Sequence, residues 1–188
     1  MKKFLFAISL AIVPILLFAQ ANSKLPEVDK SPMDMSYYPA NYPVLKIQNK
    51  ATDPITIRVI YSRPQKQGRK VFGELVEYGK VWRLGANEAT EIEFYKDVKI
   101  GGKKIPKGRY TLYAVPDETN WTLIINKDTD IWGAFKYDAK KDLLRTGVEV
   151  QKTDEVIESF SMAFEKMDIG ANLVMAWEQV KVVLPINF

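Results

Sequence analysis

The sequence predicts a mainly β protein, a single-domain antiparallel β-sandwich or jelly roll with at most one short helix. Apolar and polar residues alternate with a period of two in many short segments, the pattern of strands that bury one face. Clusters of glycine, proline, asparagine and aspartate separate these segments and indicate turns. About eight to ten such strands favour a sandwich or jelly roll over a closed barrel.

The alternation identifies the strands individually. In residues 55–61 the odd positions are apolar and positions 56 and 58 are polar, so one face of this strand belongs to the core. Residues 98–100 and 103–105 flank Gly101-Gly102, which predicts a tight hairpin. Four further segments show the same pattern: residues 109–115, 121–126, 144–151 and 159–164.

The last predicted strand changes phase. Odd positions are apolar in residues 173–177, whereas even positions are apolar in residues 180–184. A β-bulge at Glu178-Gln179 is the simplest cause, because one extra residue in a strand exchanges its two faces. If the chain contains a helix, the only segment whose pattern suits one is near residues 71–78.

The N-terminus has the pattern of a secretory signal. Lys2 and Lys3 precede an apolar run over residues 4–18, and the small-x-small pattern Ala19-Gln20-Ala21 follows. We therefore predict that residues 1–21 are a cleavable signal peptide. The apolar run is shorter than the about 20 residues that a membrane-spanning helix needs, so no membrane span is expected after cleavage.

The remaining chain divides into two parts. Residues 22–43 are rich in proline and tyrosine and are predicted to form an extended leader, whose second half lies against the domain. Residues 44–188 are predicted to form the β-sandwich domain. An exported protein of this kind is expected in the periplasm or outside the cell, and a chain without cysteine cannot carry the lipid-modified cysteine of a lipoprotein.

Composition excludes several classes of function. The formal net charge of +4 falls to +2 when Lys2 and Lys3 leave with the signal, and the basic residues are spread along the chain, so nucleic-acid binding is not expected. The absence of histidine and cysteine excludes the usual zinc, copper(II) and non-haem iron ligand sets and every nucleophile that depends on histidine or a thiol. No cofactor motif occurs. Carboxylate chemistry, hard metal ions and binding remain open.

One segment resembles the start of a calcium loop. Asn126, Asp128 and Asp130 place side-chain oxygens at alternate positions. Ile131 stands where that loop needs glycine, and Tyr137 stands where it needs a bidentate glutamate. A solvated turn is the preferred interpretation, and calcium is the weaker alternative.

The polar cluster in residues 82–90 is the first candidate site. Arg83, Asn87 and Glu88 lie between apolar strands, where an isolated charge is costly unless it is paired. The structural interpretation is an ion pair between Arg83 and Glu88 that fixes two strands in register, with Asn87 satisfying backbone groups. The functional interpretation is that Arg83 binds a carboxylate or phosphate while Glu88 acts as acceptor or general base.

An aromatic loop is the second candidate site. Trp132 and Tyr137 bracket residues 132–137 after a predicted strand, and exposed aromatic rings at the end of a β-sandwich can stack on sugar rings. The alternative is that these rings only cover the end of the core.

A longer pattern supports these expectations. The motifs concerned are Ser62-Arg63-Pro64, Val81-Trp82-Arg83, Gly85-Ala86-Asn87-Glu88-Ala89-Thr90, Ile100-Gly101-Gly102-Lys103 and Trp132-Gly133. With them the chain resembles a family of exported bacterial proteins catalogued as domain of unknown function family 2911. The resemblance spans essentially the whole mature chain and implies export and a β-rich single domain. The family has no established activity, so the resemblance implies no catalytic residue.

Three functions are compatible with the sequence. The first is a periplasmic or secreted binding or interaction module, whose ligand is a small molecule, a glycan or an envelope protein. The second is an enzyme acting on a carbohydrate or an anionic substrate through Glu88 and Arg83. The third is a structural partner in an envelope assembly, which requires a large apolar patch and no pocket. If Arg83 and Glu88 are fully buried and paired with each other, both the binding-module hypothesis and the enzyme hypothesis lose support.

Overall fold

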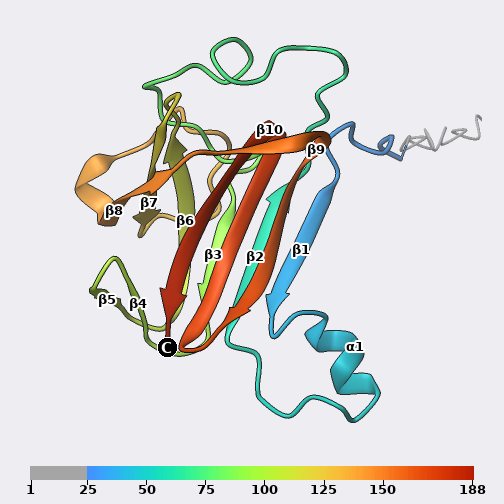
Figure 1. The fold of residues 1–188 in the computed structure, drawn as a ribbon, viewed down its shortest axis with the longest axis vertical. Helices are drawn as coiled ribbons and strands as arrows, with labels where there is room; N and C mark the ends of the chain where they lie inside the picture. The colour runs from blue at the N-terminus through green and yellow to red at the C-terminus, as the bar shows by residue number, and fades with distance from the viewer. Residues whose placement is uncertain (1–24) are drawn as a thin grey trace, which may run out of the picture.

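The computed structural model describes residues 25–188, and within them ten strands form two antiparallel sheets (Figure 1). The predicted mainly β fold is confirmed. The six-stranded sheet has the order β1 (Met33–Tyr38), β2 (Ile57–Ser62), β3 (Glu91–Phe94), β6 (Gly108–Val115), β7 (Asn120–Asn126) and β8 (Asp142–Glu149). The four-stranded sheet has the order β5 (Lys103–Ile105), β4 (Val98–Ile100), β10 (Gly170–Asn187) and β9 (Gln151–Met167).

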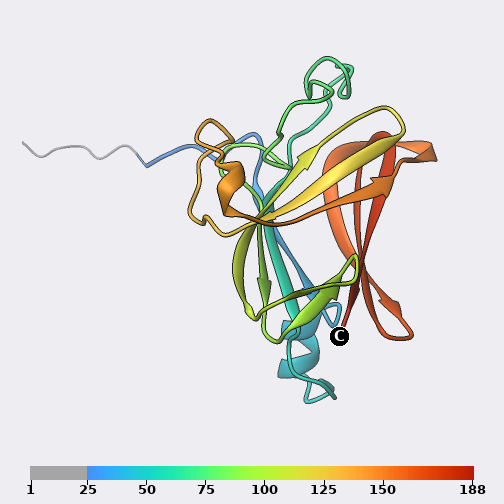
Figure 2. The same cartoon turned by 90° about the vertical axis from the view of Figure 1, so that its left-hand side faces the viewer.

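The two sheets form separate layers that enclose the core (Figure 2). The alternation along β2 explains what this strand contributes to the core. Ile57, Val59 and Tyr61 are buried, whereas Arg58 and Ile60 lie on the other face with intermediate exposure. The connection from β2 to β3 forms a long loop at one end of the sandwich, drawn in green at the top of Figure 1, and the C-terminus lies at the other end.

The position predicted for the helix is wrong. The α-helix α1 spans Tyr42–Ile47, with a proline in its first turn, and η1 (Ala139–Lys141) is a 3₁₀ turn. Residues 71–78 form turns instead. The Val76 N–H donates to the Val71 carbonyl oxygen at 2.8 Å, and Gly73, with φ of 89°, reverses the chain in a conformation that disfavours a continuous helix.

Residues 22–43, predicted as an extended leader, contain β1. This strand pairs with β2 over Met33 to Tyr38 and forms an edge of the larger sheet. The predicted signal peptide lies outside the described residues. No helix within residues 25–188 is long and apolar enough to cross a membrane.

Two local predictions about the smaller sheet are confirmed. The β4–β5 hairpin turns at Gly101 and Gly102, whose φ angles of 55° and 78° suit the tight turn that matches strand twist. In β10 the register with β9 shifts on both sides of Glu178, whose φ is 57°. This bulge directs the Glu178 carboxylate to the long loop, where it accepts the Val71 N–H at 3.3 Å and lies 3.7 Å from the Lys66 ammonium.

Side chains from β2 and its C-terminal end join the two sheets directly. The Tyr61 hydroxyl accepts the N–H of Met162 in β9 at 2.9 Å and donates to the carbonyl oxygen of the same residue at 3.2 Å. Next along the chain, Arg63 donates to the Phe160 carbonyl oxygen at 3.2 Å and pairs with Asp34 of β1 at 3.0 Å. Burial raises the pKa of Tyr61, so its hydroxyl stays neutral.

We predict that Tyr61→Phe lowers the free energy of unfolding by about 1–3 kcal/mol, because the buried Met162 N–H loses its acceptor. Tyr42→Phe is the matched control, since the Tyr42 hydroxyl has no hydrogen-bond partner among the described residues and its loss should change stability by less than about 0.5 kcal/mol. Urea unfolding measures both variants. Equal stabilities for the two would contradict a role for Tyr61 in joining the sheets.

Candidate functional site

The structure brings the two candidate segments of the sequence together. The Ala89 N–H donates to the Ile131 carbonyl oxygen at 2.8 Å, and the Gly133 N–H donates to the Asn87 carbonyl oxygen at 2.9 Å. Glu88 and Trp132 therefore face each other in a short antiparallel bridge. Residues 82–90 and the loop of residues 131–137 lie side by side.

A buried tryptophan orients the first of these segments. Trp82 is 8% exposed and exchanges two backbone hydrogen bonds with Ala114 of β6, at 2.7 Å and 3.0 Å. Its indole N–H donates to the Gly85 carbonyl oxygen at 3.1 Å. Leu84 is also fully buried. Because successive side chains of an extended segment point to opposite sides, Arg83 is directed away from the core.

The chain after Arg83 is held in a compact turn. The Thr90 hydroxyl donates to the Leu84 carbonyl oxygen, and the Thr90 N–H donates to the Arg83 carbonyl oxygen at 3.0 Å. Gly85, with φ of 155°, lies where an added Cβ would be 3.1 Å from the Ser62 carbonyl oxygen. Leu84 and Asn87 both have φ of 56°, a conformation that is costly for leucine and tolerated by asparagine.

Arg83 is half-buried and unpaired. Its Nε is buried without a hydrogen-bond partner, and no described residue forms an ion pair with its guanidinium group. Desolvation by burial lowers the pKa of Arg83 below its ordinary value. The ion pair that the structural interpretation placed between Arg83 and Glu88 is absent from residues 25–188. The chain between them turns, with φ of 56° at Leu84 and Asn87, and the two side chains line different cavities.

Arg83 lies between two adjoining cavities. The first has a volume of about 310 Å³ and includes Arg69, Asn87 and the backbone of Gly85 and Ala86 in its lining. The second has a volume of about 250 Å³ and extends to the aromatic loop. Both share Leu75, Val76, Trp82 and Arg83, so the guanidinium group stands where the two spaces meet.

The first cavity offers hydrogen-bond donors without a neighbouring acid. Among the described residues, the backbone N–H groups of Gly85, Ala86 and Asn87 donate to no other protein group, and the Asn87 amide is also unpaired. None of the described residues that line this cavity is acidic. Arg69 adds a second guanidinium, which its own hydrogen bonds to the Lys66 and Gln65 carbonyl oxygens hold in place. This arrangement can bind an anion.

Glu88 belongs to a different place. Its side chain is exposed and lines a separate cavity of about 150 Å³ with Glu91 and Asp130. Arg109 pairs with both of these acids, at 3.3 Å and 2.7 Å. Arg83 does not line this cavity, so the two residues proposed for acid–base chemistry do not converge on one space.

The two aromatic residues predicted for the site, Trp132 and Tyr137, have different surroundings. Trp132 is 61% exposed but lines neither cavity at Arg83. Tyr137 packs edge-on against Tyr113, and its hydroxyl donates to Asp142 and accepts from Arg145 at 2.8 Å. Burial and the Asp142 hydrogen bond raise the pKa of Tyr137 to about 12. These contacts give Tyr137 a packing role beneath the loop.

Phe135 was not among the site residues predicted from the sequence, although it is the aromatic residue of the loop that lines the second cavity. Its ring is 83% exposed. Three further residues that line the cavities at Arg83 were also not predicted as site residues: Arg69, Leu75 and Lys80. The available signal for Phe135 was its position inside the aromatic loop, but the antiparallel contact that carries this loop to Arg83 joins residues more than forty positions apart.

The calcium hypothesis receives no support from the geometry. Asn126 is buried, and its amide donates to the Asp138 carbonyl oxygen at 3.0 Å and to the Asp142 carboxylate at 2.7 Å. Asp128 pairs with Lys141 at 2.6 Å, and Asp130 pairs with Arg109. In the part of the chain that the structure describes, no group of three or more acidic residues could hold a metal ion.

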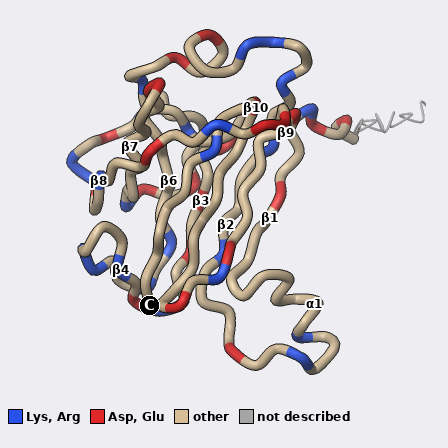
Figure 3. The backbone as a smooth tube through the Cα atoms, viewed as in Figure 1, with Lys and Arg blue, Asp and Glu red and all other residues tan. Residues whose placement is uncertain are grey.

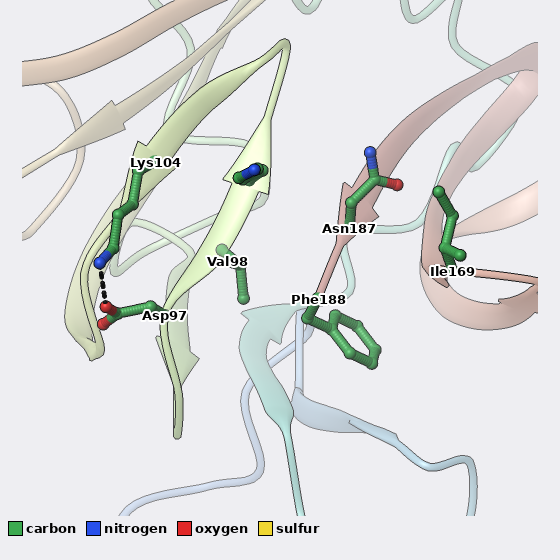
Figure 4. A pocket seen from close by; sticks show the side chains of 7 residues that line it. Asp97, Val98, Lys104, Ile169, Asn187 and Phe188 are labelled. Atoms are coloured by element: carbon green, nitrogen blue, oxygen red, sulfur yellow. Dashed lines mark ion pairs between the residues drawn. The ribbon is translucent and has the colours of Figure 1, made fainter.

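Another cavity, of about 480 Å³, lies at the opposite end of the sandwich between the β4–β5 hairpin and the end of β10 (Figure 4). Val98, Ile169 and Phe188 give it apolar walls, and its charged residues Asp97 and Lys104 pair with each other at 2.7 Å. It holds no buried unpaired polar atom comparable with the Arg83 Nε. Arg83 therefore identifies the stronger candidate site.

Comparison with known proteins supports the resemblance seen in the motifs. The family model described as Protein of unknown function (DUF2911) matches residues 43–186, and the chain therefore belongs to this family. No curated protein and no solved structure gives a significant match. The site must accordingly be interpreted from its own chemistry.

We predict that Arg83→Met leaves the free energy of unfolding unchanged or raises it by up to about 1 kcal/mol, because an apolar side chain of similar length replaces a desolvated group without partners. Arg58→Met is the matched control, because the Arg58 Nε is also buried without a partner but its guanidinium group forms an ion pair. Arg58 pairs with Glu93 on the sheet surface, so its loss should lower stability by about 1 kcal/mol. Chemical unfolding of both variants decides the matter, and a loss of more than about 1 kcal/mol in Arg83→Met would show that Arg83 is a structural residue.

Proposed function

We propose that this DUF2911 protein is a binding module that holds an anionic small molecule at Arg83 and acts outside the cytoplasm. One observation carries the binding proposal: a guanidinium group with a buried, unpaired Nε stands at the junction of two open cavities. Proteins rarely leave such a donor without an acceptor, because its desolvation is not compensated. The two Nη groups of Arg83 are not buried in this way and also have no partner among the described residues, so a bound anion would accept hydrogen bonds from them.

The chemistry of the first cavity favours a carboxylate or a phosphate. A guanidinium group presents parallel N–H donors that match the two oxygens of such a group. The Asn87 amide and the unpaired N–H groups of Gly85 to Asn87 can add hydrogen bonds. Arg69 raises the local positive charge, and the lining contains no described acid that would oppose an anion.

The two rival functions have less support. An enzyme that uses Glu88 with Arg83 needs both side chains at one reacting centre, but they line different cavities. A purely structural partner would present a large apolar patch without a pocket, whereas the long loop lines two cavities that contain charged residues. Basic and acidic residues are interspersed over the chain (Figure 3), which does not favour a nucleic-acid partner.

The proposed location depends on the N-terminal sequence. Lys2 and Lys3, the apolar run and Ala19-Gln20-Ala21 together have the order of a signal peptide. We expect the protein recovered from outside the cytoplasm to begin at Asn22. Mass spectrometry of its N-terminal peptide tests this, and an intact Met1 on that fraction would oppose cleavage.

We predict that small anions stabilise the protein through Arg83. Thermal unfolding is measured with sodium acetate, succinate, phosphate and sulfate, each against sodium chloride at equal ionic strength. An anion at about 100 times its dissociation constant should add roughly 2.7 kcal/mol, which raises the melting temperature by roughly 5–10 °C in a domain of this size. Arg83→Met should abolish the shift.

Lys99→Met is the control for this experiment. It removes the same charge from an exposed position beside the cavity at the other end of the sandwich. The control should retain the full shift. The proposal fails if no anion exceeds chloride, or if Arg83→Met responds as the unaltered protein does.

A further inference from the structure

The second cavity differs in character from the first. Leu75 and Phe135 provide apolar walls, while Glu77 and Lys80 provide a carboxylate and an ammonium group beside them. Arg83 connects this mixed space to the donors around Asn87. A molecule that fills both cavities must therefore present an anionic group at one end and, at the other, a body with both apolar and hydrogen-bonding surface.

The Phe135 ring lines this second cavity and lies over the backbone of Gly133. Gly133 has φ of 69°, and a Cβ added there would lie 2.6 Å from the ring. The hydrogen bond from the Gly133 N–H to the Asn87 carbonyl oxygen ties this backbone to the Arg83 segment. The ring is 83% exposed. An exposed aromatic face next to a cavity offers a stacking surface.

We infer that the ligand is an acidic saccharide, with its carboxylate in the first cavity at Arg83 and its sugar ring in the second. This inference rests on the proposed anion site. The C–H face of a sugar ring is apolar and can stack on Phe135, while its hydroxyl groups can donate to Glu77 and accept from Lys80. The carboxylate accepts hydrogen bonds from the guanidinium group.

The mixed lining favours a saccharide over simpler anions. An alkyl carboxylate would cover the Glu77 and Lys80 side chains with groups that cannot form hydrogen bonds, and the loss of hydration would be uncompensated. A neutral glycan could stack on Phe135 but would leave Arg83 without a charged partner. An inorganic anion would satisfy Arg83 and leave the aromatic face unused.

Titration calorimetry with defined probes tests the inference. The probes are disaccharides of galacturonate and of glucuronate, their neutral galactose and glucose counterparts, and acetate. At least one uronate disaccharide should bind at least about tenfold more tightly than acetate, and the neutral disaccharides should not bind measurably. Phe135→Ala should weaken uronate binding by about threefold to tenfold without changing acetate binding.

Trp132→Ala is the matched control, because it removes an exposed ring from the same loop that lines neither cavity. It should bind the uronates as the unaltered protein does. Equal binding of acetate and the uronates, with no effect of Phe135→Ala, would overturn the saccharide inference and leave the anion site standing. Equal binding of neutral and acidic disaccharides would overturn it as well. Binding of no anion would remove both proposals.

Discussion

The packing of Trp82 is the interaction on which the candidate site depends. Its ring lies within a cluster of five aromatic side chains, with centroids 6.1 Å from Phe72, 5.8 Å from Trp121, 5.2 Å from Phe160 and 6.1 Å from Trp177. These rings come from both sheets and from the long loop, so the cluster fastens the loop to the core without a disulfide. Once Trp82 is fixed inside, the next side chain must face outward into the cavities.

The site carries costs that the rest of the domain has to offset. Leu84 occupies a left-handed conformation that costs about 1–2 kcal/mol, and the guanidinium next to it is desolvated without an acceptor. Backbone strain and an unmatched donor in one short segment are typical of functional rather than structural regions. The supports around this segment are correspondingly strong, because Thr90 closes the turn, Gly85 fits against β2 and Glu178 fixes the start of the loop.

The sequence predicted most strands because alternation is a local property that each strand carries by itself. The bulge at Glu178 could be predicted for the same reason, because one extra residue moves the apolar side chains from odd to even positions of the strand. Arg83 could be nominated as a polar residue among apolar ones. Its relation to Glu88 could not be predicted, because it depends on the turn between them, and the approach of Phe135 depends on pairing between distant segments. Turns within residues 71–78 were misread because three buried apolar residues there resemble one face of a helix.

The absence of histidine has a consequence for how the site would respond to its surroundings. The donors around Arg83 are guanidinium groups, an amide and backbone N–H groups, and none of these changes its charge between weakly acidic and alkaline conditions. In the location proposed above, outside the cytoplasm, no cellular buffer controls the pH. A site built in this way keeps its positive charge when the medium acidifies, so any acid dependence of binding would come from the protonation of the ligand.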